Sequence, residues 1–212
     1  MDKTKTLHIV DHPLMKHKLA HLRDEKTDSK LFRELVNEIS IILGIEASRD
    51  LPVNRVKVQT PLTQADAQTI LMDQIVILPI LRAGLGMVDG LLTLFPKAKV
   101  GHLGLERDHV THLPSEYYFK LPPHSENSIC FVVDPMLATG GSVISSIEKL
   151  KDMGIKNIRF ICLIAAPEGV EVLCRSHPDV DIFIGALDEK LDVNKYIIPG
   201  LGDAGDRLYG TE

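Results

Sequence analysis

The sequence predicts an α/β fold with a parallel sheet flanked by helices. Two observations support this prediction: near-continuous apolar segments alternate with segments of helical periodicity, and several apolar segments end in loops of small residues. Apolar runs without polar alternation are typical of strands buried on both faces of a parallel sheet. The expected strands are residues 75–80, 99–105 (interrupted at His102), 129–133, 158–164 and 180–184, and the expected helices are 87–95, 143–153 and 167–174.

Two helices are expected ahead of the sheet. Pro13 suits the first turn of a helix, which continues over Leu14–Leu22. Asp28 or Ser29 can cap the second helix, and Gly44 is expected to break or end it. The apolar residues of the second helix recur at helical spacing and form one stripe: Leu31, Phe32, Leu35, Val36, Ile39, Ile42 and Leu43.

Residues 1–12 and 51–74 lack the strand–helix rhythm of the rest of the chain. The first segment shows little pattern. In the second, valines alternate with polar residues between 53 and 58, and a polar stretch after Pro61 indicates a turn. We therefore expect an extended arm near 51–74, outside the core and suited to contact a partner subunit.

Length and charge exclude several classes of protein. The chain has 212 residues, enough to bury the core of one domain. Its formal charge is −5, whereas proteins that bind nucleic acid usually carry a basic excess, so no nucleic-acid partner is expected. No apolar run reaches the roughly 18 residues that span a membrane, and no signal-like block is present, which favours a cytoplasmic protein without membrane contact. The cysteines, expected to be buried free thiols without metal or disulfide spacing, are Cys130, Cys162 and Cys174.

An acid and a small-residue loop follow the expected strand 129–133. The loop reads Asp134-Pro135-Met136-Leu137-Ala138-Thr139-Gly140-Gly141-Ser142, and helical periodicity then begins. Free N–H groups in the first turn of a helix bind anions, and Asp134 can accept hydrogen bonds from sugar hydroxyls. This combination indicates a site for a phosphorylated ribose, and the alternative is an ordinary turn with a good N-cap.

A second loop of small residues, 82–86, follows the expected strand 75–80. Arg82 in this loop can clamp a phosphate or diphosphate through two donors. One alternative is a structural turn with a surface arginine. Another is a dinucleotide-binding fingerprint, but its third glycine, Gly90, stands one position off the usual spacing, and residues 138–142 are then unexplained.

Residues 107–127 are polar and are expected to form a long loop that acts as a lid. Arg107 is the candidate ligand-binding residue of this segment because it follows a core strand directly. The other polar and ionisable residues noted there are Asp108, His109, His112, Glu116, Tyr117, Tyr118 and Lys120.

The segment 196–207 is rich in glycine and can present backbone donors and acceptors to a flat ligand such as a pyrimidine. A C-terminal cluster of turns is the alternative. His17 and His21 stand one helical turn apart, but no third metal ligand accompanies them, so an exposed helix face is expected.

Together these segments resemble the uracil phosphoribosyltransferase family, within the type I phosphoribosyltransferase fold. Residues 79–87 resemble the family's diphosphate-binding segment, and residues 134–142 resemble its ribose-phosphate loop. Residues 165–169 and 196–207 also match closely, and the last of these segments separates uracil enzymes from purine or orotate relatives. The resemblance extends from residue 12 to residue 211.

The resemblance implies a reaction. The 5-phosphoribosyl group of 5-phosphoribosyl 1-diphosphate passes to N1 of uracil, which gives UMP and diphosphate in pyrimidine salvage. It also implies that Arg82, Arg107, Asp203 and residues 134–142 bind this donor. Within the loop, Asp134 holds the ribose hydroxyls and residues 138–142 hold the 5′-phosphate.

The uracil site implied by the resemblance is formed by Ile197, Gly202, Asp203 and Ala204. Arg82 and Asp203 are the implied catalytic residues, with Mg²⁺ bound mainly through the donor and near Asp203. The resemblance further implies a homodimer or higher homo-oligomer and possible activation by GTP at an allosteric site.

The same resemblance implies one phosphoribosyltransferase domain over residues 1–212. It comprises N-terminal helices and arm (1–74), a core (75–185) and a uracil-binding hood (186–212). The family often has Tyr before the lid arginine and Asp-Glu after it, whereas this chain has Glu106, Asp108 and His109. Two other functions stay open: an RNA-binding regulator on this fold, and an enzyme for another base such as a purine.

Overall fold

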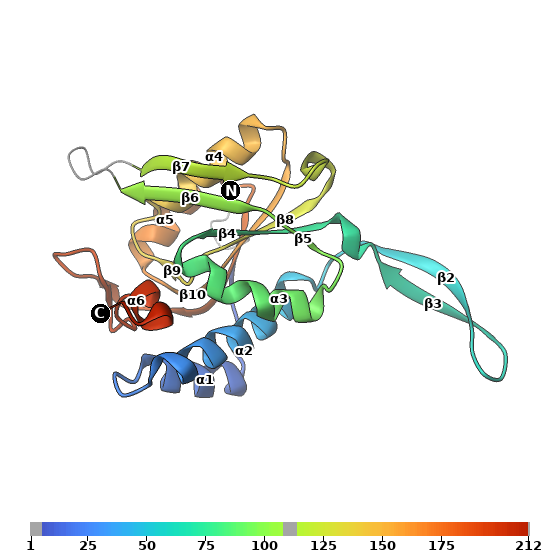
Figure 1. The fold of residues 1–212 in the computed structure, drawn as a ribbon, viewed down its shortest axis with the longest axis horizontal. Coiled ribbons are helices and arrows are strands. Elements are labelled where there is room, and N and C mark those ends of the chain that lie inside the picture. The colour runs from blue at the N-terminus through green and yellow to red at the C-terminus, as the bar shows by residue number, and fades with distance from the viewer. Residues whose placement is uncertain (1–5, 108–113, 212) are drawn as a thin grey trace.

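The computed structural model describes residues 6–107 and 114–211 (Figure 1). Within them, nine strands form one sheet that runs through the middle of the molecule. The strands are β1 (Leu7–Ile9), β4 (Ile75–Leu81), β5 (Lys99–Val100), β6 (His102–Arg107), β7 (Pro114–Lys120), β8 (Ile129–Val133), β9 (Met136–Leu137), β10 (Asn157–Ala165) and β11 (Asp181–Leu187).

The order of the strands confirms the expected α/β fold. The sheet runs β1-β11-β10-β8-β4-β6-β7, and every neighbouring pair is parallel except β6 and β7. From β4 the chain moves to β6 and β7 on one side, then returns to β8 and continues to β10 and β11 on the other. The strand order therefore reverses between β4 and β8, where open parallel sheets bind their ligands.

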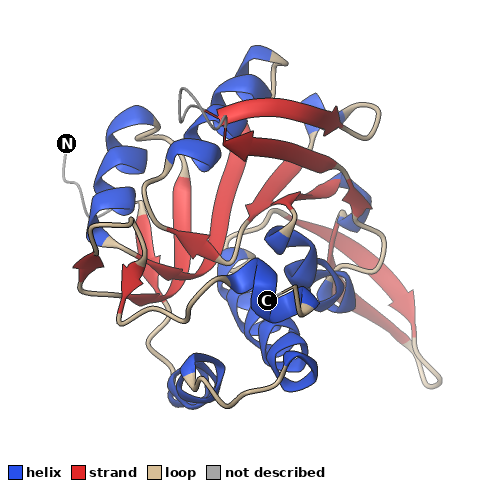
Figure 2. Cartoon of the chain, turned by 60° about the vertical axis from the view of Figure 1, so that its left-hand side comes forward, coloured by secondary structure: helices blue, strands red, loops and turns tan. Residues whose placement is uncertain are grey.

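Helices cover both faces of this sheet (Figure 2). One face packs against α1, α2, α3 and α6, and the other against α4 and α5. The helices are α1 (Pro13–Arg23), α2 (Ser29–Ala47), α3 (Val88–Leu94), α4 (Gly141–Asp152), α5 (Pro167–Ser176) and α6 (Ala204–Tyr209), with short 3₁₀ turns η1 (Met72–Gln74), η2 (Ala83–Met87) and η3 (Ser125–Asn127). Of the two expected N-cap candidates of α2, Asp28 and Ser29, the cap is Asp28. Its side chain accepts a hydrogen bond from Leu31 N at 2.8 Å.

The central strands are buried on both sides because alternate side chains enter two separate clusters. In β8, Phe131 and Val133 pack with α1, α2 and α3, whereas Cys130 and Val132 pack with α4 and α5. Successive side chains of a strand point to opposite faces, so a strand covered on both sides needs an unbroken apolar run. This requirement explains the apolar segments from which the sheet was predicted.

A hairpin leaves the body of the molecule at the expected extended arm. It consists of β2 (Val53–Gln59) and β3 (Gln64–Ile70), which pair antiparallel, and in Figure 1 it projects away from the sheet.

A second small ladder joins β12 (Lys190–Leu191) to β13 (Ile197–Ile198) near the C-terminus. Within the described residues, no helix is long and apolar enough to cross a membrane.

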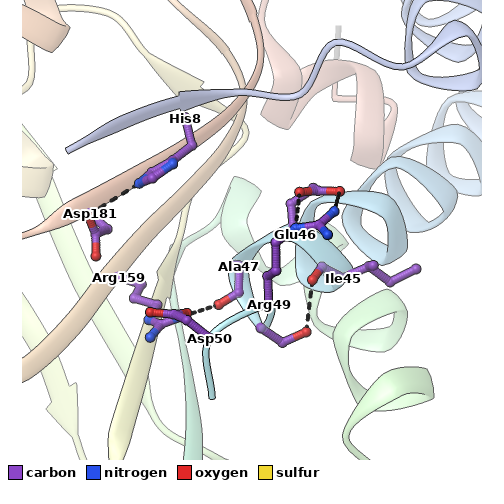
Figure 3. Close-up of polar contacts among 9 residues, drawn as sticks. His8, Ile45, Glu46, Ala47, Arg49, Asp50, Arg159 and Asp181 are labelled. Carbon is purple, nitrogen blue, oxygen red and sulfur yellow. Dashed lines mark hydrogen bonds and ion pairs between the residues drawn. The ribbon is translucent and has the colours of Figure 1, made fainter. Parts of the chain in front are cut away.

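The C-terminal end of α2 is tied to the sheet by polar contacts (Figure 3). Arg159 of β10 donates to the carbonyl oxygen of Ala47 and, at 2.6 Å, to Asp50 Oδ1. On β1, His8 Nε2 lies 3.3 Å from Asp181 Oδ1 of β11. A cavity of 780 Å³ lies at this edge, and none of the predicted site residues lines it.

Three sequence expectations about the strands and their connections are wrong. Residues 7–9 are not patternless but form β1, which pairs with β11. The strand 99–105 breaks at Gly101 rather than at His102. Residues 107–127 do not form one long loop, because residues 114–120 form β7 and hydrogen-bond to β6. The expectations about Asp108, His109 and His112 lie outside the described residues, while Tyr117 and Tyr118 are exposed on β7.

The cysteines are free, as expected, although only two are fully buried. Cys130 and Cys162 lie inside the sheet, where burial raises the pKa of both thiols. Cys174 on α5 is only partly buried, because α5 lies at the surface of the sheet rather than within it.

Gly44 does not end the second helix, which continues to Ala47. A β-carbon at Gly44 would lie 2.7 Å from Leu91 Cδ2, so the glycine allows α2 and α3 to pack closely. On the facing helix, a β-carbon at Gly90 would lie 2.4 Å from the carbonyl oxygen of Asn37, a backbone atom that cannot rotate away. Close packing of the two helices explains both glycines.

Gly90→Ala is expected to destabilise the protein even though alanine favours helices. The overpacked contact should cost about 1–3 kcal/mol and outweigh a helix-propensity gain of about 1 kcal/mol. Gly44→Ala is the matched control, with a smaller cost, because its neighbours are side-chain ends that can shift. Urea unfolding measures both free energies, and a Gly90→Ala variant as stable as the parent would contradict the packing argument.

Candidate active site

The loops after β4 and β8 lie side by side at the point where the strand order reverses. Pro79 of β4 pairs with Val133 of β8, so the two strands end at the same edge of the sheet. A β-carbon at Gly84 would lie 2.5 Å from the carbonyl oxygen of Val133. Only glycine allows this approach, which brings the Arg82 loop against the start of the Asp134 loop.

The loop after β8 has the features expected of an anion site. Asp134 ends the strand, Met136–Leu137 pair with β10 as β9, and Gly140 (φ +83°) leads into α4. Among the described residues, no side chain caps the first turn of α4. This finding contradicts the alternative of an ordinary side-chain N-cap and leaves backbone N–H groups for a ligand.

Arg82 lies directly after β4, and its side chain is available to a ligand. The guanidinium is 62% exposed, and its Nη2 lies 3.8 Å from Asp206 Oδ1. Tyr209 Oη donates a hydrogen bond to the carbonyl oxygen of Arg82 at 3.0 Å, which fixes the backbone. An arginine held at its backbone, with a mostly exposed side chain and one long ion pair, suits the binding of an incoming phosphate.

Helix α6 brings the C-terminal segment to the same place. Asp203 is its N-cap and accepts a hydrogen bond from Asp206 N at 3.0 Å. The β-carbon position of Gly205 lies 3.2 Å from Asp203 Oδ1 and 3.7 Å from Arg82 Nη2. Asp203 and Arg82, from opposite ends of the sequence, therefore approach the same point.

The Asp134 carboxyl is held in an unusual electrostatic environment. Its pKa is raised to about 7, chiefly by burial and to a smaller extent by the negative charge of Asp203, while a hydrogen bond from Met136 N opposes the shift. Asp203 is therefore close enough for its charge to contribute to the pKa of Asp134. The phosphate loop and the C-terminal segment thus share one site.

The pair of carboxyl groups fits a magnesium ion bound mostly by a ligand. Within the described residues, no group of three or more His, Cys, Asp or Glu side chains could form a complete metal site. Mg²⁺ commonly takes one or two carboxylates and completes its shell with water and substrate phosphates. Asp134 and Asp203 supply that number of protein ligands.

The remaining predicted residues fall around this centre. Ile197 lies in β13 and is buried, Gly202 has a φ of +80°, and Ala204 is buried at the start of α6. Arg107 ends β6, and its side chain lies outside the described part of the structure. His17 and His21 contact each other edge to face on an exposed helix side, as expected.

Sequence reasoning missed the residues that hold the C-terminal segment in place. Arg207 donates to the carbonyl oxygens of Leu22 and Leu201, both at 2.8 Å, and stacks on the ring of Phe32. Asp206 and Tyr209, on the same helix, contact Arg82. The glycine-rich segment drew attention to residues 196–207, but no sequence signal shows which distant residue an arginine contacts.

Comparison with known proteins identifies the family. A family model described as uracil phosphoribosyltransferase matches residues 9–211. The chain belongs to the uracil phosphoribosyltransferase family. Two relatives named uracil phosphoribosyltransferase, from Anoxybacillus flavithermus and Bacillus pumilus, are each 57% identical to it over 206 residues. In both cases the match covers 97% of this chain and 99% of the relative.

Solved structures agree with this family assignment. The AQ2163 protein from Aquifex aeolicus superposes with a TM-score of 0.91 at 38% identity, covering 97% of this chain and 99% of that protein. A hypoxanthine-guanine phosphoribosyltransferase from Bacillus anthracis has a TM-score of 0.52 at 13% identity, covering 76% of this chain and 80% of that protein, and shows a shared fold. The uracil phosphoribosyltransferase family is thus supported over nearly the whole chain, and the sequence resemblance is confirmed.

Asp134→Asn is expected to stabilise the ligand-free protein increasingly as pH rises. The folded-state pKa is about 7 against an unfolded value of about 4, so the native state retains a proton between these values that the unfolded state has lost. Parent stability therefore falls as pH rises through this window. Differential scanning fluorimetry from about pH 5 to about pH 8 should show the variant's relative melting temperature rising.

Asp50→Asn is the control for this experiment. A hydrogen bond from Arg159 lowers the pKa of Asp50, so its stabilising effect is complete above the unfolded pKa and is lost only in acid. The difference between this variant and the parent should stay constant over the same range. A constant difference for Asp134→Asn as well would contradict the raised pKa.

Proposed function

We propose that this site transfers the 5-phosphoribosyl group of 5-phosphoribosyl 1-diphosphate to N1 of uracil, giving UMP and diphosphate. The convergence of three segments carries the proposal: the phosphate loop at 134–142, Arg82 after β4, and the hood at 186–212. In this proposal residues 1–212 act as one domain, with supporting helices and arm at 1–74 and a core at 75–185.

The donor is assigned to the two loops at the reversal of strand order. Backbone N–H groups at 138–142 and the hydroxyls of Thr139 and Ser142 bind the 5′-phosphate. Asp134 accepts hydrogen bonds from the ribose hydroxyls, and the pyrophosphate end of the donor extends toward Arg82, joined by Arg107. The uncapped first turn of α4 and the exposed side chain of Arg82 support this orientation of the donor, with its 5′-phosphate at α4 and its diphosphate at Arg82.

The chemistry asks the protein for positioning and for stabilisation of charge. As the bond to diphosphate breaks, positive charge develops on the ribose ring and negative charge on the leaving group. Holding uracil N1 in line with the ribose supplies the orientation, and Arg82 lies where negative charge accumulates. Asp134 and Asp203 place negative charge near the sugar, where it favours the positively charged ring.

Enzymes of this fold generally use Mg²⁺, and we assign the ion to the donor's diphosphate oxygens with Asp203 and Asp134 beside it. When bound, the ion withdraws charge from the leaving diphosphate. Burial is the main cause of the raised pKa of Asp134, and the smaller contribution from the charge of Asp203 supports a cation near both carboxyl groups.

Uracil is assigned to the backbone of the hood. Ile197, Gly202, Asp203 and Ala204 lie on the segment that approaches Arg82 and Asp134, and their N–H and C=O groups have fixed directions. Cytosine reverses one donor of the base edge, and each mismatched buried group costs about 1–3 kcal/mol. The hood therefore selects uracil over cytosine.

Assembly into a homodimer or higher homo-oligomer is assigned to the hairpin arm, β2 and β3. Val53, Val58 and Leu62 are exposed on it, and Leu62 at its tip is 94% exposed. Exposed apolar side chains gathered on one projecting element favour burial against a second copy. Activation by GTP is proposed from the family resemblance and is measured by adding GTP to the assay below.

The enzymatic proposal predicts UMP formation from labelled uracil and 5-phosphoribosyl 1-diphosphate with Mg²⁺. Arg82→Ala should lower kcat/KM about a hundredfold, because an electrostatic donor at the leaving group is lost. Arg175→Ala, which removes an exposed arginine paired with Glu171 on α5, should leave kcat/KM unchanged. No turnover by the folded parent would remove the enzymatic proposal, and an active Arg82→Ala variant would remove the assignment of Arg82.

The assembly proposal predicts a change in mass when charge is placed on the arm. Leu62→Lys combined with Val58→Lys should shift the protein toward monomer in multi-angle light scattering, because a charged arm resists burial. Met153→Lys, a similar change at an exposed position after α4, should leave the mass unchanged. Equal masses for all three proteins would show that the arm does not make the contact.

A further inference from the structure

The turn at Gly200 lies at the centre of the hood. Its φ is +66°, and a β-carbon there would lie 2.1 Å from the carbonyl oxygen of Ile197, so the turn accepts only glycine. It lies between Ile197 and Gly202, two of the positions whose backbone groups are assigned to uracil. The shape of this turn therefore sets the spacing of the backbone groups around the base.

One ion pair holds both polar groups of the Gly200 backbone. Asp188 Oδ2 accepts from Gly200 N at 2.9 Å, and Arg23 Nη1 donates to the carbonyl oxygen of Gly200 at 2.6 Å. The two side chains also bind each other through two contacts, of 2.7 and 2.5 Å. The Asp188 side chain is 3% exposed, so water contributes little to this arrangement.

Each member of the pair belongs to a rigid element outside the hood turn. Arg23 is the last residue of α1, and Asp188 follows β11. The backbone N–H of Asp188 donates to the carbonyl oxygen of Ala165 at the end of β10, at 2.8 Å. The ion pair thus connects the sheet and the first helix to the turn that faces the base.

We propose that Arg23 and Asp188 are positioning residues for uracil, which fix the Gly200 turn and through it the base-reading backbone at Ile197 and Gly202. This inference rests on the proposed function of the hood. A recognition site needs its groups held within about 0.5 Å, and a bidentate arginine–carboxylate pair has a fixed geometry. Among the described residues, neither side chain hydrogen-bonds to the phosphate loop.

The inference predicts that changes to this ion pair weaken the binding of uracil but not the binding of the donor. Asp188→Asn removes the charge but keeps the shape, and Arg23→Lys keeps the charge but loses the two-pronged contact. Each should raise KM for uracil about tenfold, a loss typical of one charge-assisted hydrogen bond, while KM for the donor stays within about twofold. Arg23→Lys should retain more of the parent's uracil affinity than Arg23→Gln.

A double variant, Arg23→Gln with Asp188→Asn, keeps the test decisive if a single variant fails to fold. Removing both charges leaves no unpaired buried charge, which is the main cost of removing one. The double variant still releases the turn, so the rise in KM for uracil should remain. Circular dichroism and thermal melting establish that each variant is folded.

The matched control is another two-contact arginine–carboxylate pair on the surface of α2 and the turn after it. Arg49 Nη2 and Nε contact Glu46 at 2.7 and 3.1 Å, at the edge drawn in Figure 3. Arg49→Lys and Glu46→Gln should leave both KM values unchanged.

The KM values and the parent assay together distinguish failure of this inference from failure of the proposed function. A selective rise in KM for uracil in the folded variants supports the inference. Unchanged KM values, an equal rise for both substrates, or a fall in kcat alone would overturn it and assign the pair a purely structural role. If the parent itself forms no UMP, the proposed function fails, and the inference fails with it for a reason the parent assay identifies.

Discussion

The close contact between the Arg82 loop and the end of β8 is the constraint on which the site depends. β4 and β8 are parallel neighbours, and α3 and α4 lie on opposite faces of the sheet, which is the arrangement at which open parallel sheets bind their ligands. Gly84 against the carbonyl oxygen of Val133 sets how near the two loops come. The position of Arg82 relative to Asp134 follows from this contact, and the hood is added around it.

The site gathers negative charge before any ligand is present. Asp134, Asp203 and Asp206 approach one another, and Arg82 is the described cation beside them. The pKa of Asp134 is raised to about 7, chiefly because the carboxyl is buried and in smaller part because of the charge of Asp203. In the proposed function, the ribose hydroxyls of the donor and a magnesium ion would offset these effects. Active sites commonly sacrifice some stability in this way in order to complement a ligand.

The hood is a C-terminal segment supported by N-terminal helices. Arg207 contacts the carbonyl oxygen of Leu22, 185 positions earlier in the chain, and stacks on Phe32. Burial lowers the pKa of the Arg207 guanidinium, but the surrounding carbonyl oxygens satisfy its donors. In the proposed function the hood recognises the base through backbone groups, and these contacts add to the packing of its own side chains in holding that backbone in place. The first two helices therefore serve the site without contributing a residue that reacts.

The sequence by itself determined the central strands, most helices, the arm and the two glycine-bearing loops, because apolar periodicity and glycine, proline and capping residues are local signals. It also supported the family, since the loop motifs are contiguous. Only the tertiary structure decided that residues 114–120 form a strand, that Gly44 lies within a helix, and that Asp203 comes near enough to Asp134 to influence its pKa. These features depend on contacts between distant segments, and no local pattern of residues records which distant partner a side chain meets.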